Sequence, residues 1–406
     1  MKKLLQINSV VNTGSTGRIA EEIGAMATSR GWESYIAYGR YGNSSKSSLI
    51  KIGNKLDNYW HVFLTRVFDR HGFGSKKATR SLVKKINKID PDIIHLHNIH
   101  GYYININILF EYLASKGIPI VWTLHDCWAF TGHCVHFEQI GCDKWKELCS
   151  KCPQTKSYPK SLIFDNSKLN FQEKKKVFNS SKKLTIIPVS YWLQNLVEYS
   201  FLKNHSIKTI QNGIDLSIFN CKYNQSIKQK LNTQDKFIIL GVASVWDASK
   251  GFYDFIDLSK IIGEDELIIL VGLTKEQITI LPNNIVGIKK TENAEQLAEY
   301  YSTSNVFVNL TYGDTFPTTN LEALACGTPV ITYNTGGSPE AISKETGFVV
   351  DQGNIDQVVK CISRIKELKK EKFTQSCRER AEKLFDKNSK YSEYLDLYND
   401  LLNQPL

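Results

Sequence analysis

The sequence lacks any long uninterrupted apolar run. Nowhere in its 406 residues does a stretch approach the ~18 to 20 apolar residues that a membrane-spanning helix needs. The first ten residues are basic and then apolar, but Gln6 and Asn8 interrupt the run and no small-residue cleavage site follows. This pattern favours a first β-strand over a signal peptide, so we expect a cytoplasmic protein.

The chain also lacks an internal repeat, a low-complexity segment and any nucleic-acid-binding motif, so we expect no nucleic-acid partner. Its net charge of +10 is unevenly spread: residues 1–210 carry 30 Lys and Arg against 15 Asp and Glu, and the remainder carries 21 against 26. A basic first half attracts anionic partners such as phosphorylated lipids or a membrane surface. Solvated lysines on helix surfaces are the alternative explanation.

Nine cysteines without an evident leader argue against a disulfide scaffold and for reduced thiols or a metal. Five of them fall between Cys127 and Cys152, and the last two form a C-x2-C pair. Four thiols within nineteen residues suit a tetrahedral structural zinc. Buried free thiols remain the alternative, because only one C-x2-C pair is present. The candidate zinc ligands are Cys134, Cys142, Cys149 and Cys152.

Short β-rich runs alternate with helical stretches, which predicts an α/β fold with parallel sheets. The length exceeds that at which one core usually stops growing, so we expect two doubly wound domains with a ligand crevice where the carboxyl ends of their strands face each other. The predicted domains are 1–210, with a Cys-rich insert at 127–153, and 211–386; a C-terminal helix at 387–406 should return to the first domain. The predicted strands are 4–10, 35–38, 92–96, 118–124 and 184–189, then 237–242, 266–271, 284–288, 306–310 and 329–333.

The most informative segment runs from Tyr312 to Ile331 and reads as a loop, a short helix and a return strand. Pro317 favours helix initiation after it, so amides from about Thr318 onward should offer an anion site. Asp314 on the loop and Glu322 in the first helical turn can both address a ligand at that helix end. The alternative is a capping box, in which Glu322 only satisfies backbone donors near Thr319.

Together these residues resemble the E-x7-E motif of glycosyltransferase family 4, whose fold is GT-B. Asp314 stands at the first acidic position, one methylene shorter than the usual Glu, and Glu322 at the second. The continuation 323–330 and the Thr335-Gly-Gly-Ser-Pro-Glu340 segment also match. The resemblance implies that Glu322 binds the ribose of a UDP- or GDP-sugar, while Asp314 and the amides of Thr318 and Thr319 hold its sugar and phosphate.

Two further segments fit the family. Asn212-Gly-Ile-Asp215 looks like its tetrapeptide at the start of the second domain, and Lys250 matches its phosphate lysine. The family usually has an arginine at the position of Val245, and we hypothesise that Arg18 replaces it. Gly14 and Gly17 permit close backbone approach to a ligand. The predicted donor-binding residues are Gly14, Gly17, Arg18, Asn212, Lys250, Phe316, Pro317, Thr318, Thr319, Asn320, Leu321 and Glu322.

In the first half, Thr123-Leu-His-Asp126 ends a strand at its carboxyl edge. The resemblance assigns His125 to the donor sugar or reacting centre, with Asp126 beside it. His97 and His100 follow the preceding strand, and with Asp126 they are our candidates for acceptor binding. A structural histidine is the alternative in each case. The predicted catalytic residues are His125, Asp314 and Lys250.

The resemblance implies a retaining hexosyltransferase in which the departing phosphate oxygen takes the acceptor proton. No D-x-D motif lies near the donor site, so we expect catalysis to need no divalent ion. The Cys-rich insert and the 95–103 and 126–133 segments resemble a subgroup that assembles capsule and colanic-acid-type exopolysaccharide. The resemblance implies a lipid-linked saccharide acceptor and a peripheral position on the inner membrane face. A sugar-nucleotide epimerase and a non-catalytic sugar-nucleotide-binding protein are the rivals.

Residues 56–73 place aromatic and aliphatic side chains at helical spacing beside Arg66 and Arg70. Such an apolar stripe is compatible with a helix resting on a membrane surface. A helix that faces the protein core explains the stripe equally well.

Overall fold

The computed structural model describes residues 1–221, 226–231, 233 and 235–403. The chain forms two compact units, one of Met1–Gln211 with Lys390–Leu406 and one of Asn212–Ser389. The predicted end of the C-terminal helix, 404–406, lies outside the described residues.

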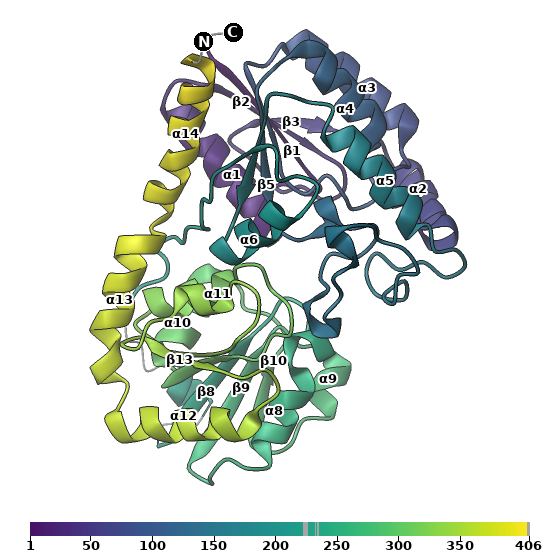
Figure 1. The fold of residues 1–406 in the computed structure, drawn as a ribbon. Helices are drawn as coiled ribbons and strands as arrows, with labels where there is room; N and C mark the ends of the chain where they lie inside the picture. The colour runs from purple at the N-terminus through teal and green to yellow at the C-terminus, as the bar shows by residue number, and fades with distance from the viewer. Residues whose placement is uncertain (222–225, 232, 234, 404–406) are drawn as a thin grey trace. The chain divides into compact units, whose positions relative to one another are not determined.

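Unit 1 is built on a seven-stranded parallel sheet in the order β3-β2-β1-β4-β5-β6-β7. Figure 1 shows α3, α4 and α5 on one side of this sheet and α1 and α14 on the other. This is a doubly wound arrangement, which places loops that can bind a ligand at the carboxyl ends of the strands. The strands are β1 (Lys3–Asn8), β2 (Glu33–Tyr38), β3 (Ser48–Lys51), β4 (Ile93–Leu96), β5 (Ile120–Leu124), β6 (Leu184–Pro188) and β7 (Ser206–Ile207).

Local capping residues set the ends of the helices of unit 1. Asn105 caps α4 by accepting from the amide of Ile108, and Gly117 ends it in the left-handed conformation at φ 64°. Helix α1 begins at Gly14, directly after extended Thr13 as its N-cap. The helices are α1 (Gly14–Ser29), α2 (Lys55–Phe68), α3 (Lys76–Ile89), α4 (Ile106–Lys116), α5 (Ser167–Phe178), α6 (Tyr191–Tyr199) and α14 (Lys387–Asn403).

The C-terminal helix α14 packs into the core of unit 1. Its buried residues share one apolar cluster with α1 and with four strands of the sheet. Its tyrosines also reach polar partners, because Tyr398 Oη lies 2.6 Å from His95 Nδ1 and Tyr394 Oη lies 3.1 Å from Thr123 Oγ1. The helix thus completes a domain whose other elements end near residue 211.

Unit 2 contains a six-stranded parallel sheet in the order β10-β9-β8-β11-β12-β13. Helix α11 packs against α10 and α13, and α12 packs against α8. The strands are β8 (Phe237–Val242), β9 (Glu266–Val271), β10 (Ile285–Ile288), β11 (Val306–Asn309), β12 (Val330–Tyr333) and β13 (Gly347–Val350). The helices are α7 (Ser226–Lys230), α8 (Phe252–Ser259), α9 (Lys275–Thr279), α10 (Ala294–Thr303), α11 (Thr318–Ala325), α12 (Ile355–Leu368) and α13 (Glu371–Phe385).

Two parallel, doubly wound sheets confirm the predicted α/β class. Among the described residues, no helix combines the length and the apolar character required to cross a bilayer.

Candidate functional site

An ion pair joins two predicted donor-site residues in unit 2. Lys250 ends the 3-10 turn after β8, and Asp314 lies on the loop after the neighbouring strand β11. Lys250 Nζ lies 3.0 Å from Asp314 Oδ2 and 3.3 Å from Thr311 Oγ1. Both side chains stay accessible, at 34% and 26% of their surface. The carboxyl ends of β8 and β11 therefore present a cation and a carboxylate side by side.

Glycines fix the backbone around this pair. Gly251 has φ +74°, and a Cβ there would lie 2.4 Å from the carbonyl oxygen of Leu310. Gly336 has φ +53°, and a Cβ there would lie 1.9 Å from the carbonyl oxygen of Asp314. Only glycine combines these conformations with such close contacts. The loops that carry Lys250 and Asp314 are thereby held against their neighbours.

Helix α11 begins directly after the Asp314 loop. Its N-cap is Pro317 and no side chain caps it, so its first amides, at Thr318 and Thr319, are placed to bind an anion. The capping-box alternative is wrong, because Thr319 lies inside the helix. Glu322 lies in the second helical turn rather than the first.

Glu322 is buried and oriented by a residue that the sequence did not single out. Its Oε2 accepts a hydrogen bond of 2.8 Å from the hydroxyl of Tyr301 on α10. Burial and the Glu322 carboxylate both raise the pKa of Tyr301 well above its usual value, so the hydroxyl stays protonated and donates. No sequence motif links these residues, which lie 21 positions apart.

Seven of the twelve residues of the predicted donor set are buried in the structure. Leu321 lies in the core, Phe316 packs its ring against Phe385, and Asn320 bonds Asn309 and the carbonyl of Ser338. Asn212 is also buried and donates to the carbonyl oxygen of Phe316. In this structure these side chains support the Asp314 loop and α11, and their donor contact stays a prediction.

The remaining donor-site candidates, Gly14, Gly17 and Arg18, differ in how exposed they are. Arg18 is exposed in the second turn of α1, and Val245 is exposed on the loop after β8. Gly14 is exposed with φ +62° and open space around it. Gly17 is buried, and a Cβ there would lie 3.1 Å from Val10 and 3.2 Å from the amide of Asn12. Gly17 therefore permits close approach to its own chain, whereas Gly14 leaves room for another molecule.

In unit 1, His125 follows β5 and is held by a chain of polar side chains. Its Nε2 lies 3.2 Å from His97 Nδ1, and His97 Nε2 lies 3.0 Å from Gln6 Oε1. Burial lowers the pKa of His125 to about 4, so the ring is neutral at pH 7. His97 is 1% exposed and uses both ring nitrogens, so we correct its role from acceptor contact to positioning of His125.

His100 and Asp126 form a second pair beside the first. His100 Nε2 lies 2.7 Å from Asp126 Oδ2, and Asp126 Oδ1 accepts from the amide of Trp128. Burial alone would raise the pKa of Asp126, but its interaction with His100 outweighs burial and lowers the pKa to about 2. The carboxylate is therefore ionised at the carboxyl end of β5 and can accept hydrogen bonds from a ligand.

The Cys-rich insert brings its four predicted zinc ligands around one cavity. A space of about 10 Å³, roughly one water-sized sphere, is lined by Cys134, Cys142, Cys149 and Cys152 together with His133. His133 is buried and places Nδ1 2.5 Å from Asp69 Oδ1. Buried Lys174 donates to the carbonyl oxygens of Trp128 and Thr131 beside the cavity. The four cysteines share this lining, but among the described residues they do not form a group of ligand atoms as close as that of Cys127, His136 and Glu138.

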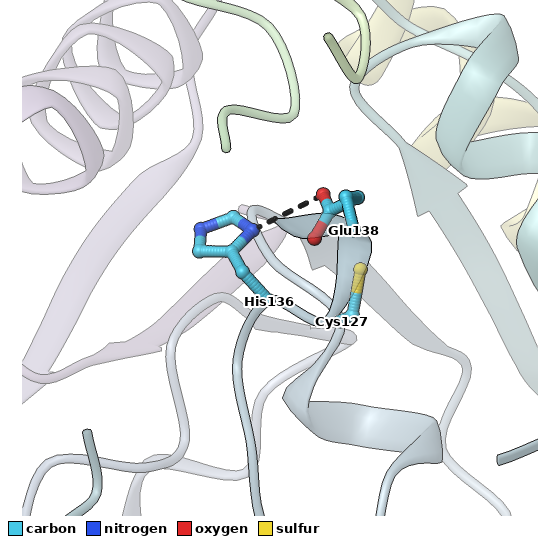
Figure 2. A group of neighbouring side chains, drawn as sticks. All are labelled: Cys127, His136 and Glu138. Atoms are coloured by element: carbon cyan, nitrogen blue, oxygen red, sulfur yellow. Dashed lines mark ion pairs between the residues drawn. The ribbon is translucent and has the colours of Figure 1, made fainter. Parts of the chain in front are cut away.

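A second group of potential metal ligands lies next to this cavity. Cys127, His136 and Glu138 place one ligand atom each within 4.8 Å of one another, and Figure 2 shows the three side chains converging. His136 Nδ1 and Glu138 Oε1 are 3.5 Å apart, so an ion pair explains why these two side chains lie close together. Sequence spacing did not suggest this group.

Comparison with protein families divides the chain much as the fold does. The family described as Glycosyltransferase Family 4 matches residues 16–218, and the family described as Glycosyl transferases group 1 matches residues 224–384. The colanic acid biosynthesis glycosyl transferase WcaC of Escherichia coli is 23% identical over 371 residues, which cover 88% of this chain and 89% of WcaC. The capsular polysaccharide biosynthesis glycosyltransferase CapM of Staphylococcus aureus is 26% identical over 54% of this chain and 62% of its own.

Solved structures share the same fold. Sucrose-phosphate synthase from Thermosynechococcus elongatus superposes with a TM-score of 0.73 at 17% identity, covering 99% of each chain. HepE from Anabaena, in complex with UDP, superposes with a TM-score of 0.69 at 15% identity over 98% of this chain and 100% of HepE. These likenesses show the GT-B fold, as the sequence predicted.

Proposed function

The chain belongs to glycosyltransferase family 4, and from this we propose that it transfers a hexose from a nucleotide-sugar to a lipid-linked saccharide during surface polysaccharide assembly. The observation that carries the proposal is the Lys250–Asp314 pair beside the uncapped start of α11. WcaC and CapM support the polysaccharide context through their described roles. HepE supports a uridine diphosphate donor, because it is described in complex with UDP and with UDP-glucose.

In the proposed donor site, the pyrophosphate binds Lys250 and the α11 amides at Thr318 and Thr319. Lysine is a compact point charge suited to phosphate, and helix N-terminal amides add a fixed positive potential. Glu322, aligned by Tyr301, binds the ribose hydroxyls, and Asp314 accepts from the sugar hydroxyls. GDP-sugars are the alternative donor class, since the residues described contact sugar and phosphate more than base.

We propose that transfer proceeds with retention of the anomeric configuration by front-face attack. The bond between the anomeric carbon and the phosphate oxygen breaks, the acceptor oxygen bonds the anomeric carbon on the same face, and the departing phosphate oxygen takes the acceptor proton. No enzymic nucleophile is needed. Lys250 and the helix amides stabilise the charge that develops on the leaving group. Neutral His125 donates a hydrogen bond to the reacting sugar without adding charge.

We assign the acceptor side to unit 1. Asp126, ionised and held by His100, accepts hydrogen bonds from acceptor hydroxyls. The basic balance of residues 1–210 suits a diphosphate-linked acceptor and a peripheral position at the inner membrane face.

We also propose that the four-cysteine cavity holds a structural zinc and that catalysis needs no other metal. Four thiolates satisfy tetrahedral zinc and leave no open position for chemistry. Buried Lys174 beside them offsets part of the negative charge of such a centre. The ion would fasten the insert next to the β5 loop that carries His125 and Asp126.

The experiment that tests the proposed activity is nucleotide release from a panel of UDP-, GDP- and ADP-sugars, with and without membrane extract that contains lipid-linked acceptors. We expect release from one donor, stimulated by extract, with a glycosylated lipid as product. Donor-induced thermal stabilisation without release would favour the non-catalytic binding protein. Conversion of the donor sugar to an epimer would favour the epimerase.

A further inference from the structure

Helix α2 exposes the aromatic stripe that the sequence left unassigned. It buries only His61 and Thr65 within unit 1. Leu56, Tyr59, Trp60, Phe63 and Phe68 are each 40% to 76% exposed. The large aromatic side chains of the stripe therefore point toward solvent, whereas Leu64 and Val67 are half-buried.

A second segment extends this exposed surface. The amides of Leu162 and Phe164 donate to the α2 carbonyl oxygens of Arg66 and Val67, at 2.7 and 3.1 Å. The rings of Phe68 and Phe164 stack with centroids 5.6 Å apart. Leu162, Ile163 and Phe164 are each more than half exposed. We define the apolar ridge as Leu56, Tyr59, Trp60, Phe63, Phe68, Leu162, Ile163 and Phe164.

A basic hollow adjoins the ridge. It has a volume of about 310 Å³ and is lined by residues 155–156 and 160–165, which include Lys156 and Lys160. Its acidic residue, Asp165, is already engaged with the amides of Cys152 and Ser167. On α2, Lys55 and Arg66 add positive charge, while Asp57 is occupied in the capping box with Asn54. The hydroxyl of Thr155 also lines the hollow, whereas that of Ser161 is buried and donates to the carbonyl oxygen of Phe164.

We propose that the apolar ridge and the basic hollow form a docking surface for an anionic phospholipid bilayer. A contiguous exposed apolar patch marks an interaction site, since soluble monomers rarely leave one uncovered. The combination of aromatic side chains on one face of a helix with flanking cations is typical of helices that lie in the interface plane. The hollow takes a lipid phosphate while the ridge enters the acyl boundary. This inference rests on the proposed function, because the enzyme must reach the membrane in order to use a membrane-bound acceptor.

Charge complementarity selects the bilayer over a second copy of the chain. A self-contact across this surface would place the cations of one copy near those of the other, whereas phosphate headgroups neutralise them. The lysines also predict a preference for anionic over neutral lipids, and a binding strength that falls with salt.

Vesicle co-sedimentation tests the surface without using the transferase reaction. The full chain is mixed with acceptor-free vesicles of phosphatidylglycerol and phosphatidylcholine, or of phosphatidylcholine alone. The variants are W60S/F63S, I163S/F164S and K156E/K160E, with Y199S/K203E as a matched control. The control removes an exposed tyrosine and lysine of unit 1 outside the ridge. Melting temperatures establish that each variant folds.

We expect each ridge or hollow variant to weaken binding to anionic vesicles by about tenfold or more, and the control to bind like wild type. Nucleotide release without membranes should stay at the wild-type rate in all four variants, so loss of docking is separable from failure of the proposed activity. Equal binding by ridge variants and control would overturn the proposal. So would equal binding to neutral vesicles, or a dimer in solution that the ridge substitutions dissociate.

Discussion

Replacing Lys250 by alanine tests whether its charge serves catalysis or the stability of the fold. The Lys250–Asp314 pair is accessible at 34% and 26%, so solvent screens it and its contribution to folding is about 0–1 kcal/mol. Stabilisation of a developing oxyanion is larger, at about 3–4 kcal/mol or a factor of about 100–1000 in kcat. We therefore expect kcat to fall about 100- to 1000-fold while Tm shifts by no more than about 4 °C.

The assay is the initial rate of nucleotide release at saturating donor, with Lys260→Ala as the matched control. Lys260 also forms an ion pair, with Asp257 at 2.7 Å, but lies exposed on the far end of α8. Its replacement should leave kcat and Tm unchanged. The reasoning is refuted if Lys250→Ala keeps wild-type kcat, or if its activity falls only in proportion to the fraction of folded protein.

Three further predictions follow from the described contacts. Gly336→Ala should destabilise unit 2 by about 2 kcal/mol or more and abolish donor binding, because a Cβ at φ +53° would lie 1.9 Å from the carbonyl oxygen of Asp314. Denaturant unfolding measures the loss of stability, and an unchanged free energy of unfolding would contradict the prediction. Stability should fall by at least about 3 kcal/mol between pH 7.5 and 5.5, because burial lowers the pKa of His61 to about 3 and of His125 to about 4. Burial also lowers the pKa of His71, His95 and His97, which adds to the fall. Below pH 6.5 the unfolded chain therefore gains protons that the folded one does not. A flat denaturant midpoint over that range would argue against buried neutral histidines. Purified protein should contain one zinc per chain by elemental analysis, and the double variant Cys149→Ser/Cys152→Ser should lose it. Chelation should leave catalysis intact until the insert unfolds. Wild-type protein that is free of metal and fully stable would contradict the zinc proposal.

Local sequence patterns predicted the features that depend on consecutive residues. The strand, loop and helix around Asp314 and Glu322 follow one another within about twenty residues, so hydrophobic pattern and Pro317 were enough to place them. The strands β3 and β7 were missed because they are short and largely exposed, with little apolar pattern to detect. Strand β13 was missed as well, although Gly347 and Val350 are buried.

Contacts between distant segments could not be predicted. Lys250 and Asp314 lie 64 positions apart, and their pairing depends on β8 and β11 being neighbours in the sheet. The Tyr301–Glu322 bond likewise depends on how α10 packs against α11. On α2, helical spacing identified an apolar face, but periodicity does not reveal whether the protein core or a membrane covers that face.

The most direct test of the proposed activity compares Glu322→Gln with wild type in a transfer assay that follows nucleotide release and glycosylated product together. The matched control is Glu295→Gln, an exposed carboxylate at the start of α10. The account predicts that wild type and control form one product per nucleotide released with the donor's anomeric configuration, and that Glu322→Gln raises the donor KM by at least about tenfold. Wild-type kinetics in Glu322→Gln, or a product of inverted configuration, would contradict it.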